Sequence, residues 1–112
     1  LVTRDETGRI VGSVQPDFAQ RPNSRHRCEL QKLLVLRSHR GHRLGSALLT
    51  AAESTARAHA RTLIVLDTSA TGNALHLYDR HGYIRAGVIP RYATDPDGPL
   101  IDTVICYKEL SA

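Results

Sequence analysis

The chain has 112 residues, of which 41% are hydrophobic and 23% are charged, and its formal net charge at pH 7 is +4. This length allows one domain with a single modest core, and the composition is typical of a globular protein. No apolar run approaches the roughly 20 residues that a membrane-spanning helix needs. We therefore predict a cytoplasmic protein without a membrane partner. Because the sequence begins at Leu1 and contains no Met, we also expect further residues to precede it in the natural protein.

The basic residues are concentrated in one part of the chain. Thirteen of the fifteen are Arg, and six of these Arg lie between residues 21 and 43. Such a stretch can bind a nucleic acid, an anionic lipid or the phosphates of a cofactor, or it can simply be a solvated face. Aromatic residues make up only 4% of the chain, which leaves few side chains to stack on bases. We therefore predict no nucleic-acid partner.

The two cysteines, Cys28 and Cys106, are far apart and do not form a C-x-x-C pair. This spacing favours reduced thiols in the core over a disulfide framework. The histidines include two close pairs, at 39/42 and 76/81, but neither pair has a nearby cysteine or the spacing of a zinc site. We therefore predict no bound metal.

The hydrophobic pattern predicts eight elements in the order β-β-β-α-β-α-β-β. Alternating or continuous apolar residues predict strands over 1–4, 9–15, 27–36, 63–66, 83–89 and 100–108. Apolar residues at helical spacing predict helices over 44–61 and 73–80, the second closed by Gly82 in a left-handed cap. Segments 16–26 and 90–99 are rich in polar residues and Pro, and predict a loop and a turn. The predicted fold class is therefore α/β, a mixed β-sheet with flanking helices.

The most informative segment is the basic turn between the third strand and the first helix. The first backbone N–H groups of a helix have no internal partner, and the helix dipole places partial positive charge there. Gly41 and Gly45 let an anion approach the backbone, and Arg40 and Arg43 add full positive charge. The pattern predicts an anion site, most naturally for phosphate. Taken alone, it is equally typical of a helix start that needs glycine and solvating arginine.

Two segments resemble the motifs of one enzyme family. Residues 40–45, Arg-Gly-His-Arg-Leu-Gly, resemble motif A of the GCN5-related N-acetyltransferases (GNAT), whose pattern is Arg/Gln-x-x-Gly-x-Gly/Ala. Residues 77–83, Leu-Tyr-Asp-Arg-His-Gly-Tyr, resemble the family's Leu-Tyr-x-x-x-Gly-Phe/Tyr segment. The resemblance implies a GNAT-type sheet that lacks the family's first strand and first two helices. The sequence departs from motif A at Arg43, which stands where the family usually has glycine.

The resemblance implies an acetyl-CoA-dependent N-acetyltransferase, with acetyl-CoA as cosubstrate. Backbone N–H groups over residues 42–46, backed by Arg40, would hold the pyrophosphate. The pantetheine arm would pair with the strand over residues 33–35. The implied cofactor-binding residues are Leu33, Leu34, Val35, Arg40, Gly41, His42, Arg43, Leu44, Gly45 and Ser46.

Three residues are the candidates for catalysis. Tyr78, by its place in the second motif, would donate a proton or hydrogen bond to the departing thiolate; alternatively, it only packs its helix against the sheet. Glu29 and Asp67 are carboxylates on inner predicted strands that border apolar runs, where an acid is costly without a task or a partner. The implied fold turns both towards the acetyl site, with Glu29 as general base and Asp67 as its partner or as an anchor for the amine. Alternatively, Glu29 pairs with Lys32 or a nearby Arg, and Asp67 only ends its strand.

A narrower likeness concerns the acceptor. Residues 29–35, 66–68, Pro90, Tyr92 and 96–98 look like the tabtoxin-resistance acetyltransferases of plant-pathogenic bacteria, which acetylate a small β-lactam amino acid. This likeness implies a primary amine on a small molecule as acceptor. Two other functions stay open: a catalytically weak acyl-CoA-binding regulatory domain, and a nucleic-acid-binding module built on the Arg-rich stretch. A homodimer also stays open.

Overall fold

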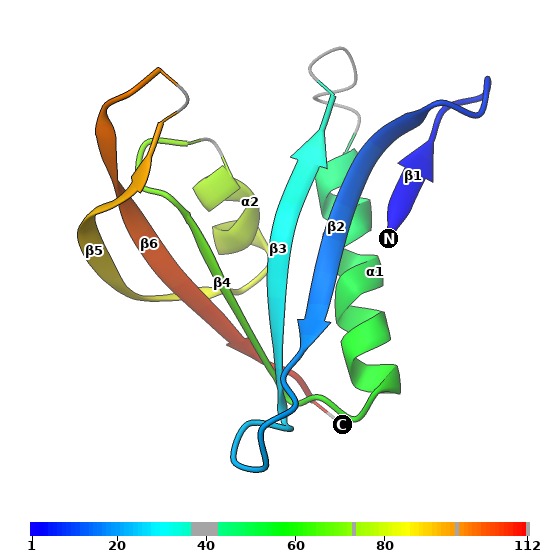
Figure 1. Cartoon of the computed structure of the whole chain (residues 1–112). Helices are drawn as coiled ribbons and strands as arrows, with labels where there is room; N and C mark the ends of the chain where they lie inside the picture. Colours follow the sequence, from blue (N-terminus) through cyan, green and yellow to red (C-terminus); the bar gives the residue numbers. More distant parts are fainter. Residues whose placement is uncertain (37–42, 73, 96, 112) are drawn as a thin grey trace. The chain divides into compact units, whose positions relative to one another are not determined.

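The computed structural model describes residues 1–36, 43–72, 74–95 and 97–111. The predicted site residues Arg40, Gly41 and His42 lie outside these ranges. The described elements follow the order β-β-β-α-β-α-β-β, which confirms the predicted α/β class (Figure 1). The strands are β1 (Val2–Arg4), β2 (Ile10–Phe18), β3 (Arg27–Val35), β4 (Leu63–Ser69), β5 (Ile84–Thr94) and β6 (Leu100–Glu109), and the helices are α1 (Leu44–Ala58) and α2 (Ala74–Arg80). Neither helix in the described part of the chain is long and apolar enough to cross a membrane.

The chain divides into two compact units. The first unit comprises residues 1–64 and 109–112, and the second comprises residues 65–108. Strand β4 begins in the first unit and continues in the second. The predicted cofactor segment and Glu29 therefore belong to the first unit, whereas Asp67 and Tyr78 belong to the second.

In the first unit, β1, β2 and β3 pair antiparallel, and α1 packs along one face of these strands (Figure 1). Gly12 of β2 allows this close packing. A Cβ atom there would lie 3.0 Å from Leu48 Cδ1 and 3.0 Å from Thr3 Cγ2, closer than real side chains approach one another. The buried apolar side chains of this unit are Val11, Val14, Cys28, Leu30, Leu48, Leu49, Ala52, Ala56, Ile64 and Leu110.

Strand β2 extends to Phe18, whereas the sequence predicted that it ends at residue 15 and that a loop follows. Proline interrupts a ladder because it lacks an N–H. However, the pairing towards β1 reaches only to Val14, whose N–H donates to the carbonyl of Leu1 at 2.9 Å. The nitrogen of Pro16 faces the same side, beyond this pairing, so no ladder hydrogen bond is lost. Phe18 then stacks on His59 with ring centroids 4.4 Å apart, which fixes the end of the strand.

Helix α1 begins where the sequence predicted but ends at Ala58 rather than at residue 61. The chain leaves the helix through Ala60, which is left-handed with φ 58°. The N–H of Arg61 then donates to the carbonyl of Ala56 at 2.9 Å. The guanidinium of Arg61 donates to the carbonyl of Ala19 at 2.7 Å. This side chain therefore ties the β2–β3 connection to the end of the helix.

In the second unit, β6 lies between β4 and β5. Strand β5 continues through residues 90–94, although the sequence predicted a turn over 90–99. A bulge in β5 accommodates Pro90 opposite Asp102. Within it, Arg91 is left-handed with φ 53°, and its backbone N–H donates to Oδ1 of Asp102 at 3.0 Å. The bulge therefore replaces the regular pairing that Pro90 cannot make.

Helix α2 ends in a left-handed glycine, as the sequence predicted. Gly82 has φ 82°, and its N–H donates to the carbonyl of Asp79 at 3.2 Å. The N–H of Tyr83 donates to the carbonyl of Tyr78 at 3.0 Å. The buried apolar side chains of the second unit are Leu66, Leu75, Tyr78, Tyr83, Val104 and Cys106.

Candidate active site

Arg43 precedes α1 in the left-handed conformation, with φ 59° and ψ 21°. A residue with a Cβ atom adopts this conformation at a steric cost, whereas glycine does not. The carbonyl of Arg43 accepts a hydrogen bond from the N–H of Ala47 at 3.1 Å, so the helix starts at once. Within the described part of the chain, the N–H groups of Leu44 and Gly45 have no hydrogen-bond partner. The first turn of α1 therefore presents free backbone donors beside the exposed Arg43.

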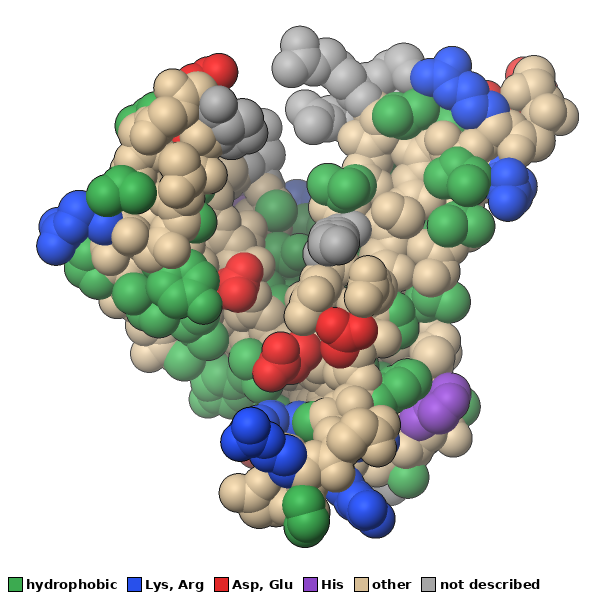
Figure 2. Space-filling model, viewed as in Figure 1, with side chains coloured by type: hydrophobic (Ala, Val, Ile, Leu, Met, Phe, Trp, Pro, Cys, Tyr) green, Lys and Arg blue, Asp and Glu red, His purple; other side chains and the backbone are tan. Residues whose placement is uncertain are grey.

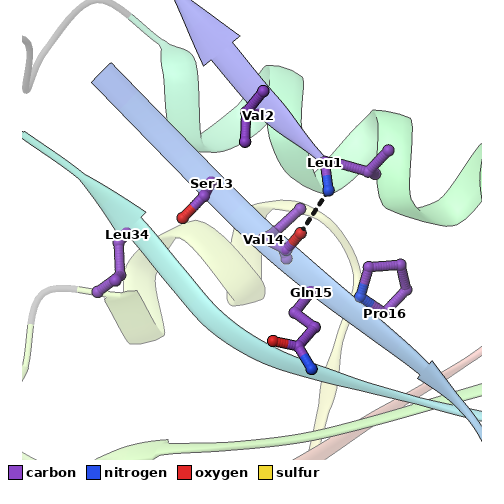
Figure 3. A pocket seen from close by; sticks show the side chains of 7 residues that line it. All are labelled: Leu1, Val2, Ser13, Val14, Gln15, Pro16 and Leu34. Carbon is purple, nitrogen blue, oxygen red and sulfur yellow. Dashed lines mark hydrogen bonds between the residues drawn. The ribbon is translucent and has the colours of Figure 1, made fainter. Parts of the chain in front are cut away.

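Leu33, Leu34 and Val35, the predicted pantetheine segment, form the end of β3. The side chain of Leu34 is 62% exposed, and those of Leu33 and Val35 are half-buried. The register with β2 shifts just before Leu34, so that β3 holds one extra residue there. Such a bulge redirects side chains and backbone. Leu34 also forms one wall of an open groove of about 300 Å³, whose other walls come from β2 and from the residues at and before the start of β1 (Figure 3).

Glu29 is exposed between the buried Cys28 and Leu30, so it points to the face of the sheet away from α1. It forms no ion pair with a described side chain. In the register of the two strands it lies directly opposite Asp17 of β2. Figure 2 shows acidic side chains next to one another on this face. The sheet therefore places two negative charges together at the position predicted for the base.

Asp17 is not among the predicted site residues, because the sequence predicts a loop over residues 16–26. Nε2 of Gln15 donates to Oδ1 of Asp17 at 3.1 Å, which orients this carboxylate. The available signal was the alternation of polar Gln15 and Asp17 with the less polar Pro16 and Phe18, which is the pattern of a strand. The presence of two Pro residues in the segment outweighed that signal.

Tyr78 has a buried ring, with only 6% of the residue exposed. No described residue forms a hydrogen bond with its hydroxyl group. No fully enclosed side-chain oxygen among the described residues lacks a partner, so this hydroxyl reaches the surface. Burial raises the pKa of Tyr78 to about 12, and nearby Cys106 and Asp67 add to this shift. Tyr78 therefore stays protonated at neutral pH, as a hydrogen-bond donor must.

Each unit brings part of the predicted site together. In the first unit, Glu29 and the segment 33–35 lie on one strand, and the start of α1 follows it in the chain. In the second unit, Asp67 is exposed on β4 and is close enough to Tyr78 for its charge to affect the phenol. The predicted meeting of Glu29 with Asp67 stays a prediction.

The cysteines are free and buried in the core. Burial raises the pKa of Cys28 to about 11, and it also raises that of Cys106. A thiol that stays protonated is a poor nucleophile at neutral pH. Both thiols are therefore packing residues. Within the described ranges, no three His, Cys, Asp or Glu side chains gather as metal ligands would.

The profile of the acetyltransferase (GNAT) family matches residues 1–83. This chain belongs to the acetyltransferase (GNAT) family. The match includes the start of α1, Glu29, Asp67 and Tyr78, so every predicted site residue lies within the family segment.

Solved structures of GNAT proteins share the fold. The chain is similar to the acetyltransferase of the GNAT family from Streptococcus pneumoniae, with 29% identity and a TM-score of 0.85, over 93% of this chain and 62% of that one. It is similar to a candidate phosphinothricin N-acetyltransferase, with 26% identity and a TM-score of 0.87, over 99% of this chain and 70% of that one. It shares its fold with yncA of Salmonella typhimurium, which was solved with acetyl-CoA, at 21% identity and a TM-score of 0.83, over 96% of this chain and 62% of that one. The chain thus spans less than two thirds of the Streptococcus pneumoniae protein.

The conformation of Arg43 can be compared with the pattern of the GNAT family. GNAT acetyltransferases use acetyl-CoA, and motif A usually has glycine at this position. Glycine would adopt the left-handed φ of 59° without strain. Anions bind where free N–H groups point out of a helix start, so the donors of Leu44 and Gly45 are candidates for binding the phosphates of this cosubstrate.

Proposed function

We propose that this chain is the acetyl-CoA-binding part of an N-acetyltransferase that transfers an acetyl group to the primary amine of a small molecule. The start of α1 carries this proposal. A 15-residue helix concentrates partial positive charge at its first turn. The N–H groups of Leu44 and Gly45 lie there beside Arg43, and neither has a partner among the described residues. The segment 33–35 would pair with the pantetheine arm.

Calorimetry with acetyl-CoA tests the cosubstrate site. Arg40→Glu replaces with an anion the cation that the family motif predicts for the pyrophosphate site. We therefore expect the affinity for acetyl-CoA to fall by at least ~10-fold, because a hydrogen bond to a charged group is worth about 1.5–3 kcal/mol. The thermal midpoint should stay the same. Arg21→Glu, an exposed arginine of the same basic stretch, is the matched control. Unchanged affinity in Arg40→Glu, or an equal loss in the control, would contradict the site.

Acetyl transfer to an amine requires removal of the amine proton, alignment of the reactants and departure of the thiolate. We assign proton removal to Glu29, directly or through a water, and the anchoring of the cationic amine to Asp67. Tyr78 donates a hydrogen bond to the departing sulfur. The exposure of Glu29, its lack of a described ion-pair partner and the protonated, surface-reaching hydroxyl of Tyr78 support these roles. Asp17 adds negative charge beside Glu29, which favours a cationic acceptor.

The acceptor is proposed to be an amino-acid-like small molecule. The likeness to a candidate phosphinothricin N-acetyltransferase supports a small acceptor, and so does the resemblance to the tabtoxin-resistance acetyltransferases. A screen of free amino acids, peptide N-termini, polyamines and amine-bearing antibiotics with the full-length protein identifies the class. With an acceptor in hand, Glu29→Gln and Asp67→Asn should each lower kcat/KM by about 100-fold. The control is Glu6→Gln, an exposed acid in the β1–β2 turn. If both variants match the control, the carboxylate assignment is wrong.

A further inference from the structure

Tyr83 makes two separate contacts with Tyr78 in the second unit. Its backbone N–H donates to the carbonyl of Tyr78 at 3.0 Å. Its ring packs edge-on against the ring of Tyr78, with centroids 5.6 Å apart and planes at 60°. Both residues are buried, with 6% of Tyr78 and 5% of Tyr83 exposed. Tyr83 therefore restrains both the backbone and the ring of the proposed hydrogen-bond donor.

Lys108 of β6 contacts the ring of Tyr83. Its Nζ lies 5.5 Å from the centroid of the Tyr83 ring, within the range of a cation–π interaction. Tyr107, its neighbour in sequence, is in register with Ile84, which directly follows Tyr83. The pairing of β5 with β6 therefore brings Lys108 to Tyr83, and the contacts run from Lys108 through Tyr83 to Tyr78.

We propose that Tyr83 and Lys108 are positioning residues for acetyl transfer: they hold the ring of Tyr78 so that its hydroxyl stays at one place. The inference rests on the proposed role of Tyr78. A tyrosine hydroxyl lies at the end of a long side chain, so a small rotation of the ring displaces it by an ångström or more. A displacement of about 1 Å in a reacting group can cost up to 100-fold in rate. An edge-to-face aromatic neighbour limits such rotation, because the pair has a preferred geometry.

A merely structural role for Tyr83 and Lys108 makes a different prediction. If these residues only fill the core, their loss lowers stability. Any change in kcat is then the same whether or not the Tyr78 hydroxyl is present. If they position the hydroxyl, their loss lowers kcat only while that hydroxyl is present. A double-mutant cycle with Tyr78→Phe separates the two roles, because it measures whether one change depends on the other.

The experiment measures kcat, the KM for acetyl-CoA and the thermal midpoint of full-length protein with its identified acceptor. Lys108→Met keeps an apolar stem and removes the charge, and we expect kcat to fall ~3-fold with the KM within twofold of wild type. Tyr83→Leu removes the ring, and we expect kcat to fall ~10-fold. Tyr83→Phe keeps the ring contact with Tyr78, so its kcat should stay close to the wild-type value. Arg80→Met, an exposed cation on α2, is the matched control and should leave kcat unchanged.

The cycle decides the outcome. Lys108→Met should have no further effect on kcat in the Tyr78→Phe background, which would support the positioning role. The positioning role is overturned if Lys108→Met lowers kcat by the same factor in the wild-type and Tyr78→Phe backgrounds, or if it lowers kcat in neither. If Tyr78→Phe alone still lowers kcat, the role of Tyr78 stands. Full kcat in Tyr78→Phe alone would overturn the role of Tyr78 and this inference with it. Because Lys108→Met changes a half-buried side chain rather than a core ring, it tests the proposal even if Tyr83→Leu fails to fold.

Discussion

The start of α1 and the end of α2 both place a left-handed residue beside a proposed site residue, but they do so with different side chains. At the end of α2 the residue is Gly82, with φ 82°, which adopts this conformation freely. At the start of α1 it is Arg43, with φ 59°, for which the conformation costs about 1–2 kcal/mol. We infer that the end of α2 is closed without strain, whereas the start of α1 accepts some strain at a residue that carries a charge.

The largest expected effect is on kcat, and it tests whether Tyr78 near the end of α2 takes part in acetyl transfer. Tyr78→Phe removes one oxygen and keeps the buried ring, so packing is preserved. We expect kcat to fall by about 100-fold, because a positioned proton donor contributes at least this factor, while the KM for acetyl-CoA and the thermal midpoint stay close to wild type. Steady-state kinetics and a melting curve check this. A variant with full kcat would show that the end of α2 has only a packing role. The start of α1 would then be the functional one of the two regions.

The second effect concerns alkaline pH, where the end of α2 titrates. Burial raises the pKa of Tyr78 from 10.0 to about 12. Below about pH 10 both the folded and the unfolded chain hold this proton, so its contribution to stability is fully present. Between pH 10 and 12 the unfolded chain loses the proton first, so stability falls with rising pH, by at most about 1.4 kcal/mol per pH unit. Urea unfolding from pH 8 to 12 should show a shallower loss in Tyr78→Phe than in wild type. The separate loss from Cys28, whose pKa is raised from 9.0 to about 11, remains in both proteins. Equal slopes above pH 10 would contradict the burial of the phenol.

The sequence predicted the elements well where the evidence is local. Periodicity located both helices and the cores of all six strands, since each pattern depends on neighbouring residues. It failed at the ends of β2 and β5, where Pro16 and Pro90 suggested breaks. Whether proline breaks a strand depends on what lies across from its nitrogen, which is a property of the sheet. For Pro16 the ladder had already ended on that side, and for Pro90 a bulge absorbed the loss.

The candidate site shows the same division. The motifs located Arg43, Gly45 and Tyr78, because the family's residues recur at fixed spacing. Asp17 was missed because its place opposite Glu29 is set by the register between two strands. The left-handed conformation of Arg43 follows from backbone geometry, so the sequence revealed the departure from glycine but not its cost.

A smaller effect measures what the left-handed glycine contributes at the end of α2. A Cβ atom added at Gly82 would meet nothing within 4 Å, so the cost of Gly82→Ala comes from the backbone conformation alone. We expect the free energy of unfolding to fall by about 1–2 kcal/mol. Gly87→Ala is the matched control, because that position also has open space and its φ is not in the left-handed region. An equal change in both variants would show that the conformation at Gly82 carries no special cost.

The smallest effect tests whether Arg43 is strained in order to carry a charge. Arg43→Gly removes the steric cost of the left-handed conformation, although the more flexible glycine stabilises the unfolded chain, so the net gain in the free energy of unfolding should be about 0.5–1 kcal/mol. Arg43→Ala keeps the Cβ atom and hence the strain, so its stability should stay close to wild type. Both variants lose the charge, and calorimetry should give the same loss of acetyl-CoA affinity, roughly threefold for an exposed cation. Higher stability in the glycine variant, combined with matching affinity losses, would show that strain and charge at this position are separable. If the glycine variant is no more stable than the alanine variant, Arg43 sits in its conformation without strain, and the two helix ends do not differ in the way that we infer.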